Sequence, residues 1–304
     1  MRQPDFLKPG DRIGIIAPAR KVSREELKAG IEILNGWGYE CVEGKFLYGD
    51  YHQFSGTDEE RAADFQSMIN DKSIRAILTA RGGYGCLRIV DLLDFSPMKN
   101  DPKWFCGFSD MTVIHAFLQK NLNMQSLHSI MVFNMMPERF HKDAVESLGR
   151  ALSGVDLCYE YLPDPIYNGF GRSGNAKGEV IGGNLSLIYA LSGSNCDMDM
   201  KGKILLLEDL DEYLYHIDRM MRQLKRSGKL DHLAGLVIGG MTDMKDNTIP
   251  FGWNATQIIN DIVAEYNYPV CFGFPAGHQK DNRALFMGRE ATLSVGDKVR
   301  LEYI

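Results

Sequence analysis

Short apolar runs and helix-like segments alternate along the first half of the chain. Each run carries hydrophobic residues on both faces, which is typical of parallel strands covered on both sides. The intervening segments place apolar residues three and four positions apart, and one opens with Thr57 and Glu60 at capping-box spacing. The pattern therefore predicts an α/β fold with a parallel sheet. The predicted strands are residues 11–17, 39–42, 74–79 and 104–106, and the predicted helices are 23–34, 57–69, 87–93 and a segment around 113–117.

The pattern changes after residue 153. Residues 154–177 are rich in Pro, Gly, Asn and Ser, which is the composition of a linker or long surface loop. We predict two domains, 1–153 and 178–304, and the second is of mixed α/β or partly barrel-like character. It ends in a predicted hairpin at Ala291–Tyr303. Its other predicted strands are 178–183, 203–207, 236–240 and 269–273, and its predicted helices are 185–191 and 213–226.

Composition narrows the class of protein. The chain has 304 residues, of which 44% are apolar and 24% charged, as in ordinary globular proteins. The net charge of −6 gives no reason to expect nucleic acid or an anionic membrane as partner. No apolar run approaches the roughly 20 residues of a membrane span, and the start of the chain lacks a signal-peptide pattern. Six cysteines without a C-x-x-C pair favour free thiols in a reducing compartment, so we expect a cytoplasmic location.

A serine lies where the hydrophobic period changes from strand to helix. The segment Gly107-Phe108-Ser109-Asp110 follows a buried strand and precedes a helix, which is the setting of a nucleophile elbow. The match to G-x-S-x-G is partial, because Met111 occupies the position of the second glycine. Ser and Asp are also favoured helix caps, so these residues alone leave open whether Ser109 is a nucleophile or an N-cap.

A glycine-rich segment follows the preceding strand. In Arg81-Gly82-Gly83-Tyr84-Gly85, the glycines allow close approach of the backbone to an anion such as a carboxylate or an oxyanion. A tight connection from strand to helix is an equally good interpretation. In either case the segment lies at the carboxyl end of its strand, as Ser109 does, and ligands of parallel sheets bind at that edge.

A nucleophilic serine needs a base and an orienting carboxylate. His278 ends the apolar run 270–274 after Pro-Ala-Gly, where a base would be displayed. Glu208 and Asp209 close the apolar strand 203–207, either as a solvated strand end or as a charge held for a purpose. His115 lies in the helix after Ser109, and we expect it to point away from the elbow. The order Ser, Glu, His supports a serine hydrolase.

Several segments in sequence order resemble the murein tetrapeptide L,D-carboxypeptidase family, which also contains the microcin C immunity proteins. The resemblance runs through nearly the whole chain, and Ser109 matches the family nucleophile, Glu208 its acid and His278 its base. It implies a Rossmann-like N-terminal domain, a C-terminal domain with a small barrel, and a homodimer. The segments are LKPGDRIGIIAPA, FSGTDEERAADFQ, IRAILTARGGYG, GFSD, VIGGNL, ILLLEDLDE and GFPAGH.

The resemblance also implies an oxyanion hole and a substrate. Gly82, Gly83 and the amide of Asp110 match the region that binds the oxyanion. The implied reaction is release of terminal D-alanine from a cytoplasmic cell-wall tetrapeptide during peptidoglycan recycling, with no metal or cofactor. Two segments differ from many members: SLHSIM, where they have His-Gly-Pro, and Pro18-Ala19-Arg20, where they have small polar residues. These differences bear on substrate preference.

Three other functions compete with this prediction. A microcin-immunity-like hydrolase would cut an adenylate analogue and would need an aromatic shelf for the adenine. A binding protein would hold a carboxylate on the glycine segment without turnover. A nucleotide-binding Rossmann protein is disfavoured because the G-x-G-x-x-G order and an acidic residue at the end of the second strand are missing.

Overall fold

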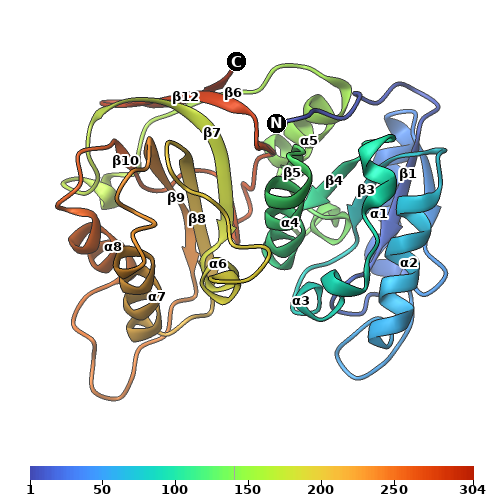
Figure 1. Ribbon diagram of the computed structural model, residues 1–304, viewed down its shortest axis with the longest axis horizontal. Helices are drawn as coiled ribbons and strands as arrows, with labels where there is room; N and C mark the ends of the chain where they lie inside the picture. The colour runs from blue at the N-terminus through green and yellow to red at the C-terminus, as the bar shows by residue number, and fades with distance from the viewer. Residues whose placement is uncertain (140) are drawn as a thin grey trace. The chain divides into compact units, whose positions relative to one another are not determined.

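The computed structural model describes residues 1–139 and 141–304, and the chain divides into two compact units (Figure 1). Unit 1 comprises Met1–Asp156 and Lys280–Phe286, and unit 2 comprises Leu157–Gln279 and Met287–Ile304. We predicted a linker at residues 154–177. In the structure, residues 157–177 belong to unit 2 and include a strand. Residues 280–286 were predicted as part of the second domain, but the chain returns there to unit 1.

Unit 1 is built on a six-stranded sheet of order β11-β5-β4-β3-β1-β2. The pairs among β1 to β5 are parallel, so the predicted α/β fold is confirmed. The strands are β1 (Arg12–Ile16), β2 (Glu40–Glu43), β3 (Ile74–Thr79), β4 (Trp104–Gly107), β5 (Ser126–His128) and β11 (Leu285–Met287). The helices are α1 (Arg24–Gly36), α2 (Asp58–Asn70), α3 (Cys86–Ile89), α4 (Thr112–Leu122) and α5 (Lys142–Ser153).

The helices α1 and α2 begin where their side chains cap them. Ser23 and Glu26 form a reciprocal capping box at α1, and Thr57 and Glu60 form one at α2. Both helices carry acidic residues in the first turn, which the helix dipole favours. The predicted helix 87–93 is shorter than expected, because α3 has four residues and gives way to a 3-10 turn.

The late strand β11 completes the sheet of unit 1. Phe286 packs on Trp104 of β4, with ring centroids 5.5 Å apart. The amide of Ala284 donates to Ser147 Oγ at 2.8 Å, which fixes the strand to α5. The strand β5, with His128 at its end, is therefore flanked on both sides.

Unit 2 is built on a seven-stranded mixed sheet of order β10-β9-β8-β7-β12-β13-β6. The long strand β7 joins a parallel half, β7 to β10, to an antiparallel half that contains the predicted terminal hairpin (Figure 1). The strands are β6 (Cys158–Tyr161), β7 (Gly174–Asn184), β8 (Ile204–Leu210), β9 (Gly235–Thr242), β10 (Val270–Cys271), β12 (Glu290–Val295) and β13 (Val299–Tyr303). The helices are α6 (Leu185–Leu191), α7 (Leu214–Arg226) and α8 (Ala255–Val263).

Contacts between the two outer strands give this sheet its barrel-like character. The Tyr161 hydroxyl of β6 donates to the Phe272 carbonyl just after β10, at 3.2 Å. Arg172 and Val270 exchange backbone hydrogen bonds of 2.9 and 3.0 Å. The sheet therefore curls so that β10 and β6, its outer strands, approach each other. This agrees with the predicted mixed domain with barrel-like strands.

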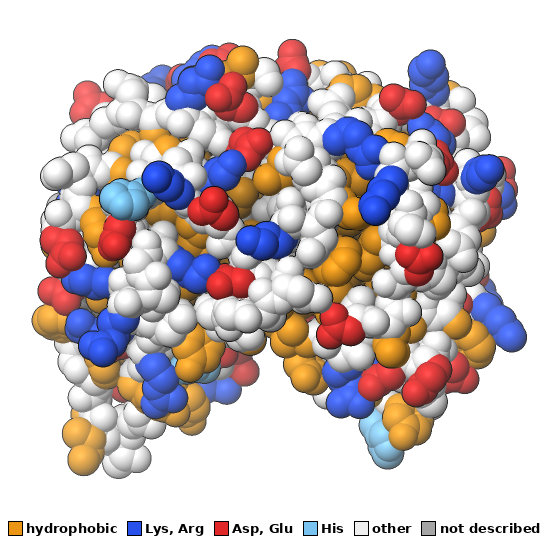
Figure 2. Space-filling model, viewed as in Figure 1, with side chains coloured by type: hydrophobic (Ala, Val, Ile, Leu, Met, Phe, Trp, Pro, Cys, Tyr) orange, Lys and Arg blue, Asp and Glu red, His pale blue; other side chains and the backbone are white. Residues whose placement is uncertain are grey.

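The surface carries charges of both signs. On the face shown in Figure 2, acidic and basic side chains are interspersed. The helix α7 buries Ile217, Met220, Met221 and Leu224, so its basic residues form a solvated face as predicted. Among the described residues, no helix combines the length and apolar character needed to cross a membrane.

Candidate active site

Ser109 occupies a strained turn at the end of a fully buried strand. Its φ is +60°, a value uncommon for a residue with a side chain, and it follows Gly107, whose φ is +150°. The N-cap of α4 is Met111, so the alternative that Ser109 caps this helix is wrong. The turn has the strand-to-helix geometry of a nucleophile elbow, and we call residues 107–110 the elbow.

The glycine loop, Arg81–Gly85, lies against the elbow. A Cβ built on Gly82 would stand 3.4 Å from Ser109 Oγ, so this backbone passes directly beside the serine hydroxyl. Gly83 has a φ of +121°, and a Cβ there would come within 2.5 Å of the Arg20 side chain. The structure therefore brings Gly82 beside Ser109, whereas Gly83 lies against Arg20.

The side chain of Asp110 points back to the end of this loop. Asp110 is 1% exposed, and its Oδ2 accepts a hydrogen bond of 2.7 Å from the amide of Cys86. Burial raises the pKa of Asp110 to about 6, against the lowering effects of the Cys86 hydrogen bonds and the Arg61 charge. Our sequence interpretation used only the amide of Asp110 and missed this carboxylate.

His115 lies closer to the elbow than expected. Its Nε2 lies 2.9 Å from the carbonyl oxygen of Gly107, so the expectation that it points away from the elbow is wrong. Burial lowers the pKa of His115 to about 3, despite the hydrogen bond to Gly107, which raises it. A neutral imidazole that fixes the strand end explains this position.

Glu208 and His278 form a buried pair in unit 2, which we call the dyad. Glu208 lies in β8, and its Oε2 is 2.6 Å from His278 Nδ1 and 3.2 Å from the His278 amide nitrogen. The Glu208 side chain is fully buried and that of His278 is 15% exposed. Gly277 has a φ of +93°, and a Cβ there would lie 2.5 Å from Glu208 Cβ, so only glycine allows this approach.

The dyad stands in a field of negative charge. Burial lowers the pKa of His278, but the charge and hydrogen bond of Glu208 and the charge of Asp209 outweigh it, so the pKa is raised above its usual 6.5. Burial, followed by the charge of Glu208, raises the pKa of Asp209 to about 7. Asp209 accepts hydrogen bonds from Asn184 Nδ2, Ser186 N and Leu210 N, each at 2.9 Å.

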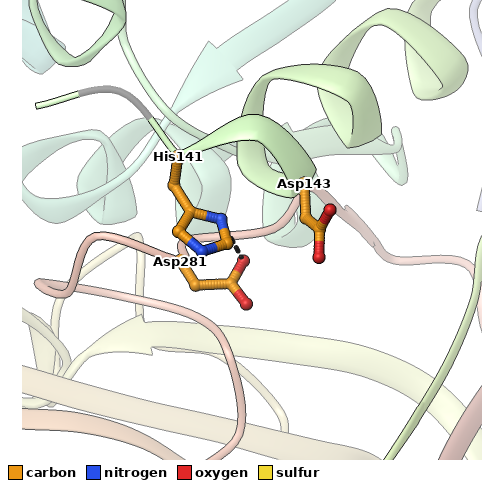
Figure 3. Close-up of side chains that lie close together, drawn as sticks. All are labelled: His141, Asp143 and Asp281. Atoms are coloured by element: carbon orange, nitrogen blue, oxygen red, sulfur yellow. Dashed lines mark ion pairs between the residues drawn. The ribbon is translucent and has the colours of Figure 1, made fainter. Parts of the chain in front are cut away.

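Within the described part of the chain, one group of potential metal ligands is made of residues other than those of the elbow and the dyad. His141, Asp143 and Asp281 in unit 1 place one ligand atom each within 4.8 Å of one another (Figure 3). The guanidinium of Arg283 contacts both carboxylates at 2.8 Å and so supplies the positive charge that they attract. We assign no metal to this cluster.

The second strand, β2, does end in an acidic residue, Glu43, so the expectation that it lacks one is wrong. Glu43 accepts a hydrogen bond from the Tyr48 hydroxyl at 2.6 Å and pairs with Arg24 at 3.0 Å. The missing glycine fingerprint remains the reason to disfavour a dinucleotide.

Family models match most of the chain. The LD-carboxypeptidase N-terminal domain model of Peptidase_S66 matches residues 13–129, and the C-terminal domain model matches residues 177–293. The chain belongs to the LD-carboxypeptidase family. It is therefore a serine-type carboxypeptidase, and the first match contains Ser109 while the second contains Glu208 and His278.

Individual relatives of this LD-carboxypeptidase cover nearly all of it. A probable murein peptide carboxypeptidase of Bacillus subtilis is 31% identical, over 97% of this chain and 92% of its own. The muramoyltetrapeptide carboxypeptidase of Oxalobacter formigenes is 26% identical, with a TM-score of 0.85 over 96% and 98% of the two chains. The microcin C7 self-immunity protein MccF in complex with aspartyl sulfamoyl adenosine is 21% identical and shares the fold, with a TM-score of 0.87 over 99% and 98%.

Proposed function

We propose that Ser109, Glu208 and His278 act together as a catalytic triad that releases terminal D-alanine from a murein tetrapeptide. The observation that carries the proposal is the contact between Glu208 and His278 Nδ1 at 2.6 Å. It holds the imidazole in one orientation and leaves Nε2 as the nitrogen that takes the Ser109 proton. The strained elbow supports the role of Ser109, because it displays a hydroxyl at the carboxyl end of a strand.

The reaction has two halves. In the first, His278 accepts the proton as Ser109 Oγ attacks the carbonyl of the L-centre of the diamino acid, and then donates it to the departing D-alanine amine. In the second, His278 removes a proton from water, which attacks the acyl-enzyme; His278 then returns this proton to Ser109 Oγ as the tripeptide leaves. Each step uses side-chain chemistry, so the mechanism needs no metal ion and no cofactor.

Backbone amides stabilise the charge that develops on the carbonyl oxygen. The amides of Gly82, Gly83 and Asp110 are the proposed donors, because the glycine loop passes beside Ser109. One such donor typically contributes a factor of about 10² to 10³ to kcat. The proposed setting is peptidoglycan recycling in the cytoplasm by a homodimer.

A second candidate is hydrolysis of an aminoacyl-adenylate analogue. The fold shared with MccF bound to aspartyl sulfamoyl adenosine favours it. Ser109 would attack the aminoacyl carbonyl, and His278 would again take its proton. The two candidates therefore differ in the leaving group, which is D-alanine in the first and the adenylate analogue in the second.

Mass spectrometry of the products distinguishes these candidates. We expect the wild type to remove one D-alanine from murein tetrapeptide, and Ser109→Ala to lose about 10⁴ to 10⁶ of this rate while still binding the peptide. Ser67→Ala is the control, because Ser67 is an exposed residue of α2 whose hydroxyl donates to the Asp64 carbonyl, and its loss should leave turnover within about twofold.

Each other outcome selects a different function. Cleavage of aspartyl sulfamoyl adenosine without cleavage of the tetrapeptide would select the second candidate. A wild type that binds tetrapeptide but cleaves neither compound would be a binding protein.

A further inference from the structure

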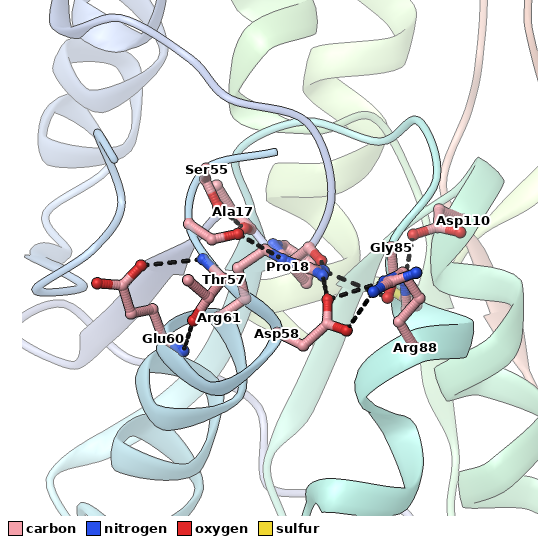
Figure 4. A network of polar contacts seen from close by, with 12 residues as sticks. Ala17, Pro18, Ser55, Thr57, Asp58, Glu60, Arg61, Gly85, Arg88 and Asp110 are labelled. Carbon is pink, nitrogen blue, oxygen red and sulfur yellow. Dashed lines mark hydrogen bonds and ion pairs between the residues drawn. The ribbon is translucent and has the colours of Figure 1, made fainter. Parts of the chain in front are cut away.

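The Gly85–Cys86 peptide group, at the end of the glycine loop, is held from both sides. Its N–H donates to Asp110 Oδ2 at 2.7 Å, and its carbonyl oxygen accepts from Arg61 Nη1 at 3.2 Å. Figure 4 shows Gly85 between Arg61, which comes from α2, and Asp110. One peptide group thus lies between a buried cation and a buried anion, and we call this arrangement the peptide clamp.

Arg61 is itself fixed by the surrounding backbone. Its side chain is fully buried, and it also donates to the carbonyls of Pro18 and Gly56 and pairs with Asp58. Asp58 in turn pairs with Arg88 at 2.6 Å (Figure 4). Charge-assisted hydrogen bonds in a buried network are stronger and better oriented than exposed ones, so the cationic side of the clamp is rigid.

The absence of a side chain at Gly85 allows its carbonyl to approach Arg61. A Cβ at that position would lie 2.6 Å from both Arg61 Nη1 and the Pro18 carbonyl oxygen. Any side chain would therefore push the peptide group away from Arg61. The glycine allows the backbone itself to bind the guanidinium.

The clamp lies three residues from the part of the loop that faces the serine. Gly82 passes beside Ser109 Oγ, and the Ser109–Asp110 bond joins the elbow to the anionic side of the clamp. The residue that offers its amide to the oxyanion thus also fixes the loop that offers the others. A loop of four glycine and aromatic positions between Arg81 and Cys86 has little stiffness of its own, so this tether sets the spacing of the donors.

We propose that the Asp110 carboxylate is a positioning residue that sets the distance between the glycine loop and Ser109 and so completes the oxyanion hole. This inference rests on the proposed serine mechanism and deepens it. A purely structural role, as a cap on the short helix α3, is the alternative that the experiment separates from it.

The test compares Asp110→Ala, Asp110→Asn and Asp64→Ala by steady-state kinetics on murein tetrapeptide and by hydrogen exchange. Asp64 is a matched control, because it is a buried carboxylate of unit 1 that accepts a 2.8 Å bond from the Phe46 amide. We expect Asp110→Ala to lose about 10²-fold in kcat with KM within about threefold, since the oxyanion forms only in the transition state. Asp110→Asn keeps an acceptor oxygen for the Cys86 amide, so its kcat should be at least about tenfold higher than that of Asp110→Ala.

Hydrogen exchange supplies a readout that does not depend on turnover. In Asp110→Ala the amides of residues 82–86 should exchange at least about tenfold faster than in the wild type, whereas Asp64→Ala should leave them unchanged. Unchanged exchange in this segment, an equal kcat loss in Asp64→Ala, or a change confined to KM would overturn the proposal. A wild type that releases no D-alanine would reject the proposed function, and the exchange of residues 82–86 would then decide the clamp alone.

Discussion

The two units place a buried aspartate after a proposed catalytic residue in the same way. Asp110 follows Ser109 at the end of β4 and binds the first amide of α3, which follows the neighbouring strand β3. Asp209 follows Glu208 in β8 and binds the Ser186 amide in α6, which follows the neighbouring strand β7. Each aspartate therefore ties the proposed catalytic residue before it to a helix that follows the neighbouring strand.

The two aspartates differ in the charge opposite them. Burial raises both pKa values; the Arg61 charge works against it at Asp110, where the pKa is about 6, and the Glu208 charge adds to it at Asp209, where the pKa is about 7. In unit 1 the aspartate holds a peptide group of the loop whose amides are the proposed oxyanion donors. In unit 2 the aspartate adds its charge to that of the dyad. The same local arrangement thus controls geometry in one unit and protonation in the other.

Among the variants that test this comparison, the largest effect is expected from the dyad of unit 2. Glu208→Gln should lower kcat by about 10³ to 10⁴, because a neutral amide no longer fixes the imidazole tautomer or stabilises the imidazolium. Steady-state kinetics at pH 8 measure it. Glu212→Gln is the control, since Glu212 pairs with His216 at the same 2.6 Å but is 24% exposed, and turnover should stay within about twofold. Equal losses in both variants would contradict the assignment of the dyad.

The next effect tests the proposed oxyanion donors in the glycine loop of unit 1. Gly82→Ala places a methyl group 3.4 Å from Ser109 Oγ and 3.2 Å from Met131 Cε. The methyl group should occupy the space that the carbonyl oxygen of the substrate needs, so kcat should fall by about 10 to 10²-fold. Gly36→Ala, at the end of α1, meets no atom within 4 Å and should leave kcat unchanged and stability equal or slightly higher. If Gly82→Ala retained full kcat, the loop would not border the oxyanion.

The smallest effect concerns protonation. The charge of Asp209 contributes to the raised pKa of His278, and neutral His278 is the active form in the proposed mechanism, so activity should fall as pH drops through that pKa. Asp209→Asn removes the charge, and the acid limb of kcat/KM should move to lower pH by about 0.5 to 1 unit. A pH profile from 5 to 9 measures the shift. The exposed Asp211, changed to Asn, should leave the profile in place, and an upward shift for Asp209→Asn would reverse the assigned sign.

The sequence predicted the elements that depend on local patterns. The first four parallel strands of unit 1, the capping box of Thr57 and Glu60 and the terminal hairpin are encoded within about a dozen residues each, and all three are confirmed. The elbow could be found because a strand pattern and a helix pattern meet at Ser109. Glu208 and His278 stood out because each ends an apolar run.

The sequence could not predict contacts that depend on distant segments. Asp110 and Cys86 are separated by 24 residues, and no local pattern indicates that the carboxylate of one binds the amide of the other. The return of β11 to unit 1 depends on Phe286 meeting Trp104, about 180 residues earlier in the chain. One signal was present, since the two motifs that carry the proposed catalytic residues, Ser-Asp and Glu-Asp, both have an aspartate in second place, and only the structure shows what it binds.

The position of β11 has a consequence for how this protein is made. Unit 1 needs residues 280–286, so a ribosome must complete nearly all of unit 2 before the sheet of unit 1 can close. Until then β5 is an open edge whose amides and carbonyls are available to other chains. A fragment that stops at residue 153 would keep that edge permanently, and the two halves are better regarded as one translation product that folds as a whole than as modules that can be exchanged.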